Sequence, residues 1–210
     1  DYQLVIIGFG ISGIATARWA EKNNLKYIVL EKNDTFGGVW VDTFDYTCLQ
    51  TDKIFYQFSE LEYPTSVSSY PAKHQILDYF NDYITKFNLN KNVSYGSTVN
   101  SAHFCKESNK WIIETNGKKY TTEYLAVCSG FFHNKSKDNI PTLDTSKCDK
   151  VNRKLVVGNG ASANDFLKHT YDTGGLQETK YDLIYNKVYF LLERILLFLI
   201  CQLNQQLIFQ

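Results

Sequence analysis

The sequence lacks methionine altogether, contains only 3 prolines and carries no net charge over its 210 residues. Its 22 lysines and arginines balance 22 aspartates and glutamates, so no overall field directs the chain toward nucleic acid or an anionic membrane. Average usage would place roughly four or five methionines in a chain of this length. We therefore expect that the printed sequence omits residues, the first ones included.

The cysteines have no spacing that suits a metal site. Their number is odd, which favours free buried thiols in a reducing compartment, and no signal peptide precedes the first strand pattern. We expect a cytoplasmic protein. No Ser/His/Asp arrangement is present, so we assign no catalytic side chain and no metal ligand. The five cysteines are Cys48, Cys105, Cys128, Cys148 and Cys201.

The sequence also lacks an apolar run of about 20 residues, the length that spans a bilayer. Residues 188–200 come nearest, but Glu193 and Arg194 interrupt them. This pattern favours a buried helix, and a helix on the membrane surface is the alternative.

Residues 3–40 contain the parts of a dinucleotide-binding unit. The apolar run 3–7 predicts a buried strand, and a helix rich in small residues follows it. A second strand is predicted over 27–30 and ends on Glu31. Between the first strand and the helix lies a Gly-x-Gly-x-x-Gly turn, Gly8-Phe9-Gly10-Ile11-Ser12-Gly13. A glycine triad in this strand–turn–helix–strand–acid setting is far more specific than a lone triad.

Each part of this unit has a physical role in binding a nucleotide. Gly8 permits the tight turn, Gly10 lets the backbone approach a pyrophosphate, and Gly13 lets the helix pack closely. The start of the helix offers free N–H groups and a positive dipole end to phosphates. Glu31 can accept hydrogen bonds from ribose hydroxyls, and its charge would repel the 2′-phosphate of NADP. The first unit therefore predicts FAD or NAD.

A second unit of the same kind begins near residue 154. The apolar run 154–157 leads into Gly158-Asn159-Gly160-Ala161-Ser162-Ala163, the permitted Gly-x-Gly-x-x-Ala form of the turn. Because one nucleotide needs only one such turn, two of them predict two nucleotides that meet for hydride transfer to a flavin.

The residues between the two turns resemble the flavin-containing monooxygenase family, in its plant-like variant. Gly37-Gly38-Val39-Trp40 is similar to the family's Gly-Gly-x-Trp segment, and residues 46–64 to its Tyr-x-x-Leu-x-Thr-Asn segment with the Phe-Ser-Asp-Phe-Pro continuation. Residues 124–130 resemble the strand that ends in Ala-Thr-Gly, and 156–165 the NADPH-binding Val-Gly-x-Gly-x-Ser-x-x-Asp. The resemblance covers residues 3–167.

The resemblance implies which residues contact each cofactor. For FAD they are Gly8, Phe9, Gly10, Ile11, Ser12, Gly13, Glu31, Lys32, Gly38, Val39, Trp40, Thr51 and Val99. For NADPH they are Gly158, Gly160, Ser162 and Ala163, with Lys180 and Lys187 as candidates for the 2′-phosphate. Animal-type members of the family carry Asn after the Thr, facing the flavin, but this chain has Asp52 there, so that amide is not carried over. The family's Phe-x-Gly-x-x-x-His linker and its return strand are absent.

Three local patterns predict further elements. Ile76, Tyr79, Phe80, Tyr83 and Phe87 have helical spacing and predict a buried helix face. Residues 93–99 predict a strand, and Asn116-Gly117 predicts a hairpin between 111–115 and 119–122. In addition, the family resemblance implies a buried strand over residues 124–130.

These observations predict an α/β protein with two Rossmann-like domains, an FAD-binding domain over 1–145 and an incomplete NADPH-binding domain over 146–210. The resemblance implies that NADPH reduces the flavin and that one oxygen atom of O2 passes to nitrogen or sulfur of a small molecule. No nucleic-acid partner is expected. The alternatives are a degenerate flavoprotein without turnover and another FAD- and NAD(P)-dependent oxidoreductase; a disulfide reductase would need a Cys pair that the sequence lacks.

Overall fold

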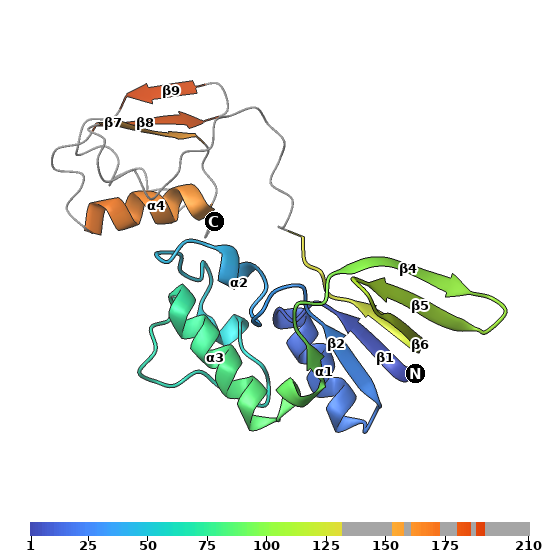
Figure 1. Cartoon of the computed structure of the whole chain (residues 1–210). Coiled ribbons are helices and arrows are strands. Elements are labelled where there is room, and N and C mark those ends of the chain that lie inside the picture. Colours follow the sequence, from blue (N-terminus) through green and yellow to red (C-terminus); the bar gives the residue numbers. More distant parts are fainter. Residues whose placement is uncertain (132–152, 158–160, 173–179, 186–187, 192–210) are drawn as a thin grey trace. The chain divides into compact units, whose positions relative to one another are not determined.

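The computed structural model describes residues 1–131, 153–157, 161–172, 180–185 and 188–191 (Figure 1). They belong to two compact units. The first consists of Asp1–Asp45 and Thr51–Ser136, and the second of Tyr46–Gln50 and Lys137–Gln210. The chain therefore enters the second unit for five residues, 46–50, and returns to the first before it finally crosses over.

The first unit is built on a six-stranded sheet with the order β3-β2-β1-β6-β5-β4 (Figure 1). The pairs β1–β2, β2–β3 and β1–β6 are parallel, whereas β4–β5 and β5–β6 are antiparallel. The strands are β1 (Tyr2–Ile7), β2 (Tyr27–Leu30), β3 (Val93–Ser94), β4 (Val99–Cys105), β5 (Lys110–Thr115) and β6 (Lys119–Val127). The parallel half carries the first glycine turn.

Strand β6 joins the two halves of the sheet. Its first part, Lys119–Thr122, pairs with β5 through the predicted Asn116-Gly117 hairpin, in which Gly117 has a φ of 93°. Its second part, Tyr124–Val127, pairs with Leu4–Ile7 of β1. The sequence predicted two strands here, and the structure has one, because both pairings continue along the same extended backbone.

Helix α1 (Ile11–Lys22) packs against β1 and β2 and buries its small-residue side, including Ala17 and Ala20. Helix α3 (Lys73–Lys86) buries four of the five residues predicted for its face, whereas Phe87 follows the helix and is half-buried. The Gln75 side chain accepts a hydrogen bond from the Ala72 N–H at the start of the helix, at 3.0 Å. The buried residues of α3 are Ile76, Tyr79, Phe80, Tyr83 and Ile84. The short helices are α2 (Val39–Asp42), η1 (Lys53–Phe55) and η2 (Leu89–Asn92).

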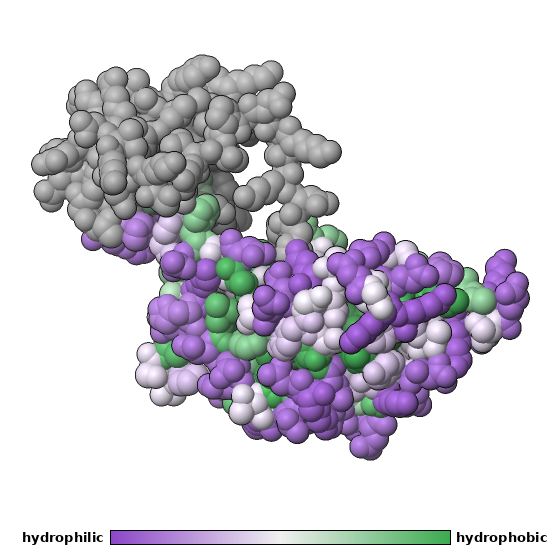
Figure 2. Space-filling model, viewed as in Figure 1, coloured by the Kyte–Doolittle hydropathy of each residue, from purple (hydrophilic) through white to green (hydrophobic). Residues whose placement is uncertain are grey.

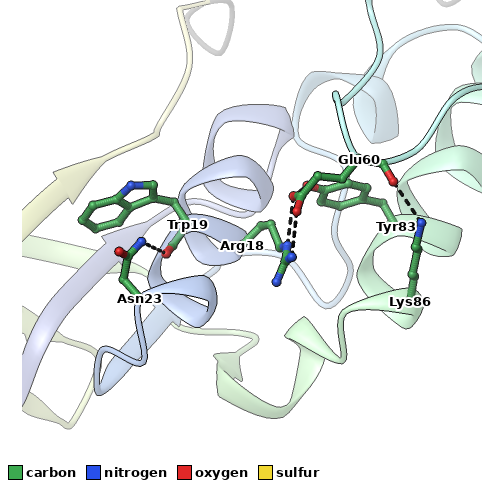
Figure 3. A network of polar contacts seen from close by, with 6 residues as sticks. All are labelled: Arg18, Trp19, Asn23, Glu60, Tyr83 and Lys86. Carbon is green, nitrogen blue, oxygen red and sulfur yellow. Dashed lines mark hydrogen bonds and ion pairs between the residues drawn. The ribbon is translucent and has the colours of Figure 1, made fainter.

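An ion pair with aromatic neighbours links α1 to α3 (Figure 3). The Nε and Nη2 atoms of Arg18 lie 2.9 and 2.7 Å from the two carboxylate oxygens of Glu60, and the Tyr83 hydroxyl donates to the same carboxylate at 3.0 Å. The Lys86 ammonium donates to the Glu60 main-chain oxygen, and the Arg18 guanidinium lies 3.8 Å from the centre of the Phe87 ring. Hydrogen bonding from Arg18 lowers the pKa of Glu60 to about 2.

The second unit follows a β–α–β order. Strand β7 (Arg153–Val157) is parallel to β8 (Lys180–Tyr185), and helix α4 (Ala161–Asp172) lies between them in the chain. Strand β9 (Val188–Leu191) is antiparallel to β8. A parallel pair needs a crossover connection, and α4 supplies it.

Two predictions of secondary structure were wrong. Residues 93–99 are not one strand, because Gly96, with a φ of 62°, turns the chain between β3 and β4. Residues 188–191 form a strand where a helix was predicted, since pairing with β8 fixes an extended backbone. The rest of that apolar run, 192–200, lies outside the described residues.

Apolar side chains reach the surface of the first unit in small areas. On the face shown in Figure 2 these areas lie among hydrophilic residues. Among the residues that the structure describes, no helix is both long enough and apolar enough to cross a membrane.

Candidate dinucleotide-binding site

The first glycine turn has the geometry that a close backbone approach requires. Gly8 has a φ of 97°, and a Cβ atom there would lie 2.6 Å from the Cys128 carbonyl oxygen. A Cβ at Gly13 would lie 1.9 Å from the Gly8 oxygen. Gly13 thus lets helix α1 pack directly on the turn, close to the role predicted from the sequence. Gly10 precedes the helix, and no side chain caps its N-terminus, so N–H groups of the first turn remain available to a ligand.

The Gly37-Gly38 segment packs against this turn. The Gly37 N–H donates to the Phe9 carbonyl oxygen at 3.0 Å. Cβ atoms built at Gly10 and Gly38 would lie 3.3 and 3.0 Å from the other residue's Cα atom. Both Gly37 and Gly38 have positive φ, 123° and 58°, which glycine adopts at no steric penalty. The two glycine segments therefore form one surface of bare backbone.

Glu31 lies beneath this surface and is 4% exposed. Its Oε2 accepts the Phe9 N–H at 2.6 Å and its Oε1 accepts the Asn33 N–H at 2.9 Å. The Glu31 main chain is also fixed, since its N–H donates to Ser94 and its oxygen accepts from Ser97. Each carboxylate oxygen has more than one acceptor position, so these two hydrogen bonds do not use all of them.

The side chains of Phe9 and Trp40 are packing elements in this structure. Phe9 is fully buried, and its ring meets Tyr95 edge-on at 6.3 Å. Trp40 is 9% exposed, and its Nε1 donates to the Tyr56 hydroxyl at 2.7 Å. A cofactor contact at Phe9 would therefore come from its backbone. Val39, beside Trp40 in α2, is exposed.

The other predicted FAD contacts lie around the two glycine segments or at the edge of the sheet. Ile11 and Ser12 open helix α1, with Ser12 exposed, and Lys32 follows Glu31 and is exposed. Val99 begins β4 and packs on the core formed by Val5, Leu30 and Ile113. Thr51 is exposed and precedes Asp52.

Asp52, which replaces the amide of the similar family, has a local structural role. Its carboxylate accepts the Ile54 N–H at 3.0 Å and so caps the short helix η1. Asp is among the residues preferred at the start of a helix. The departure from the family's pattern is thus compatible with the local fold.

The second glycine turn is only partly described. Gly158 and Gly160 lie outside the described residues, as does Lys187. Ser162 and Ala163 lie in the first turn of α4, directly after the gap that follows β7. Lys180 begins β8. Strand β7 and helix α4 match the strand and the helix predicted for this unit, and the parallel strand β8 was not predicted.

Sequence reasoning missed two neighbours of the first turn. The Cys128 N–H donates to the Ile7 oxygen at 2.8 Å, and the Cys128 thiol lies 3.7 Å from the Thr16 hydroxyl on α1. The Cys-Ser-Gly segment that directly follows β6 is the signal that could have placed Cys128 beside Gly8. Cys48, Cys105 and Cys128 are free and half-buried. Among the residues described, no group of acidic, histidine and cysteine side chains could hold a metal.

A family model described as "Pyridine nucleotide-disulphide oxidoreductase" matches residues 5–179. The chain is 33% identical over 120 residues to "Probable indole-3-pyruvate monooxygenase YUCCA8" of Arabidopsis thaliana, covering 57% of this chain and 28% of that protein. It is 27% identical over 152 residues to "Uncharacterized oxidoreductase CzcO" of Bacillus subtilis (strain 168), covering 72% and 42%. The chain thus spans less than half the length of these relatives.

Solved structures show the same fold. A cyclohexanone monooxygenase mutant from Rhodococcus sp. Phi1 bound to NADP+ matches with a TM-score of 0.72 at 22% identity, over 88% of this chain and 38% of that one. OTEMO in complex with FAD and NADP matches with a TM-score of 0.71 at 17% identity, again over 88% and 38%. The predicted α/β fold with two dinucleotide-binding units is therefore confirmed.

Proposed function

Because the chain belongs to the pyridine nucleotide-disulphide oxidoreductase family and is similar to its flavin-dependent monooxygenases, we propose that its first unit binds FAD and its second unit NADPH. The activity would be transfer of one oxygen atom of O2 to a small molecule. The observation that carries the proposal is the joint surface of Gly8–Gly13 and Gly37-Gly38 above the buried carboxylate of Glu31.

The residues of the first unit fit FAD. The uncapped start of α1 would receive the pyrophosphate between the two glycine segments. Glu31 would accept from the ribose hydroxyls through the acceptor positions that Phe9 and Asn33 leave unused. Lys32, Val39, Trp40, Thr51 and Val99 remain proposed contacts.

The division of cofactors between the units follows from charge. A 2′-phosphate at Glu31 would bring two negative groups together in a buried place, which is unfavourable. NADPH would therefore bind the second turn, at Gly158, Gly160, Ser162 and Ala163.

When bound, FAD would supply the chemistry of hydride acceptance and O2 activation. This chain's residues would bind and orient the two cofactors and exclude water. The family resemblance favours a nitrogen or sulfur atom as the acceptor of oxygen.

The first experiment identifies the chromophore. The protein is reconstituted with FAD or FMN, and the retained flavin is released by heat and identified by mass. We expect FAD. In Gly10→Val, a branched side chain would meet the Gly38 backbone and separate the two glycine segments, so flavin occupancy should collapse. Ala15→Val, on an exposed position of the same helix, is the matched control. Retention of FMN, or full occupancy in Gly10→Val, would refute the FAD site.

The second experiment tests the other unit by anaerobic addition of NADPH. The flavin of the parent should bleach rapidly, whereas Gly160→Val should keep its FAD and be reduced slowly at limiting NADPH through weaker binding. A yellow parent that NADPH does not bleach would favour the alternative, a flavoprotein without turnover. Equal reduction of parent and variant would make the second turn structural.

A further inference from the structure

Residues Tyr46–Gln50 form a short segment that is separated from its chain neighbours. Asp45 before it and Thr51 after it belong to the first unit, whereas the segment itself belongs to the second. Leu49 within it is buried. The two units are therefore connected by the chain at three points, and two of these flank this segment.

The segment is held on helix α4 by a hydrogen bond and by ring stacking. The Gln50 Nε2 donates to the Asp165 Oδ1 at 2.8 Å. The Tyr46 ring stacks on His169 with centroids 4.7 Å apart and planes at 16°, and it meets Phe166 edge-on at 6.1 Å. Both ends of the five-residue segment thus contact the same helix.

Asp165 is a buried carboxylate on helix α4, which is unusual for a side chain whose only role is packing. It is 8% exposed, and its Oδ2 atom is buried without a hydrogen-bond partner among the described residues. Burial raises the pKa of Asp165, opposed by the hydrogen bond from Gln50. A buried carboxylate is unfavourable unless hydrogen bonds satisfy it. The hydrogen bond from the Gln50 side chain opposes this rise in pKa most, ahead of one from the Cys48 backbone.

We propose that Gln50 and Asp165 are a positioning pair that couples the second nucleotide-binding helix to Thr51. The proposal rests on the proposed function, in which the first turn of α4 holds NADPH and Thr51 contacts FAD. Asp165 lies about one turn beyond Ser162 and Ala163 on α4, and Gln50 directly precedes Thr51. Binding of the NADPH phosphates to α4 would restrain the segment Tyr46–Gln50. Because Gln50 is bonded directly to Thr51, it would also restrain Thr51, the proposed contact with FAD.

The alkylation rate of Cys48, in the middle of the segment, measures how firmly the segment is held on α4, and the measurement needs no cofactor. The Cys48 thiol is half-buried, so opening of the segment should increase its rate of alkylation by iodoacetamide. Cys105, in the β-hairpin of the first unit, serves as the internal reference. Asp165 itself is left unchanged in this assay, because its charge helps to raise the pKa of the Cys48 thiol and its removal would alter reactivity directly.

In the cofactor-free protein, Gln50→Leu should increase the alkylation rate of Cys48 relative to Cys105 by about fivefold or more. Gln57→Leu is the matched control: Gln57 accepts the Tyr63 N–H within the first unit, and its loss should leave Cys48 unchanged. Tyr46→Leu, which removes the stacking on His169, is the second variant if Gln50→Leu does not fold. An unchanged rate of Cys48 alkylation in a folded variant would overturn the claim that Gln50 holds the segment on α4.

The coupling claim is tested with NADP+ and then with NADPH. NADP+ should slow alkylation of Cys48 in the parent, with binding measured separately by calorimetry. In Gln50→Leu reconstituted with FAD, the rate of flavin reduction at saturating NADPH should fall about tenfold while the Kd for NADPH changes little. A contact that only stabilised the fold would not slow flavin reduction while leaving the Kd for NADPH unchanged.

The outcomes separate the two proposals. Binding of NADP+ without any change at Cys48 overturns the coupling and leaves the NADPH site in place. Absence of binding overturns both the NADPH site and the coupling, while the result with Gln50→Leu alone still decides whether the segment is docked.

Discussion

Replacement of Glu31 by alanine tests the innermost part of the first site. The carboxylate accepts the N–H groups of Phe9 and Asn33, at 2.6 and 2.9 Å, and is 4% exposed. Glu31→Ala leaves both donors without their acceptor, and the Phe9 N–H is buried. The variant should therefore be destabilised even when no cofactor is present.

The expected loss follows from these two hydrogen bonds. A hydrogen bond to a charged group contributes about 1.5–3 kcal/mol, and an orphaned buried donor adds a desolvation penalty of similar size. Alanine also removes a buried charge, which offsets part of the loss. We expect the free energy of unfolding to fall by about 3 kcal/mol. Glu31→Gln keeps one acceptor oxygen but presents an NH2 group to the other donor, so it should lose about half as much.

Urea unfolding of the cofactor-free protein, followed by far-ultraviolet circular dichroism, measures this difference. Glu123→Gln, on an exposed position of β6, is the control and should shift the free energy by less than about 0.5 kcal/mol. If Glu31→Ala is as stable as the control, the two hydrogen bonds do not support the turn and the reasoning is refuted.

Two further outcomes follow from the first unit. The hydrogen bond from Arg18 lowers the pKa of Glu60 from its ordinary value of 4.5 to about 2. The ionised pair therefore stabilises the fold fully above about pH 4.5 and loses this effect as the pH falls toward 2. The unfolding midpoints of Glu60→Gln should lack this acid-dependent step. Gly13→Ala should have a much lower midpoint of thermal unfolding than Gly10→Ala. The new Cβ would lie 1.9 Å from a backbone oxygen in Gly13→Ala but 3.3 Å from a Cα atom in Gly10→Ala. Equal midpoints would contradict the packing seen at Gly13.

The first nucleotide unit could be read from the sequence because its determinants are local. The strand, the glycine turn and the helix follow one another within residues 2–22, and Glu31 ends the next strand. Gly13 meets the Gly8 oxygen within the turn itself, whereas the close contacts of Gly8 and Gly10 are with Cys128 and Gly38. The buried face of α3 was predictable for the same reason, since its spacing repeats with the helix turn.

The features that were missed depend on which segments pair with one another. No local signal distinguishes two short strands from the single strand β6, whose halves pair with β5 and β1. Strand β9 has an apolar sequence that suits either a helix or a strand, and its pairing with β8 decides. The contact of Gln50 with Asp165 joins residues 115 positions apart, which the spacing of residue types cannot indicate.

Loss of flavin from a Glu31 variant has two explanations, because Glu31 has two roles. The carboxylate both supports the turn through the Phe9 N–H and, by our proposal, binds the ribose. A Glu31 variant without flavin would therefore be explained by a distorted turn as well as by a lost ligand contact. Gly10→Val has the same ambiguity, since its side chain acts on Gly38. The comparison that separates the roles is ligand-side: FAD and an analogue lacking the ribose 2′-hydroxyl of its adenosine, bound to the parent protein. A loss of affinity for the analogue in the unchanged protein assigns the hydroxyl contact, because no protein hydrogen bond has been altered.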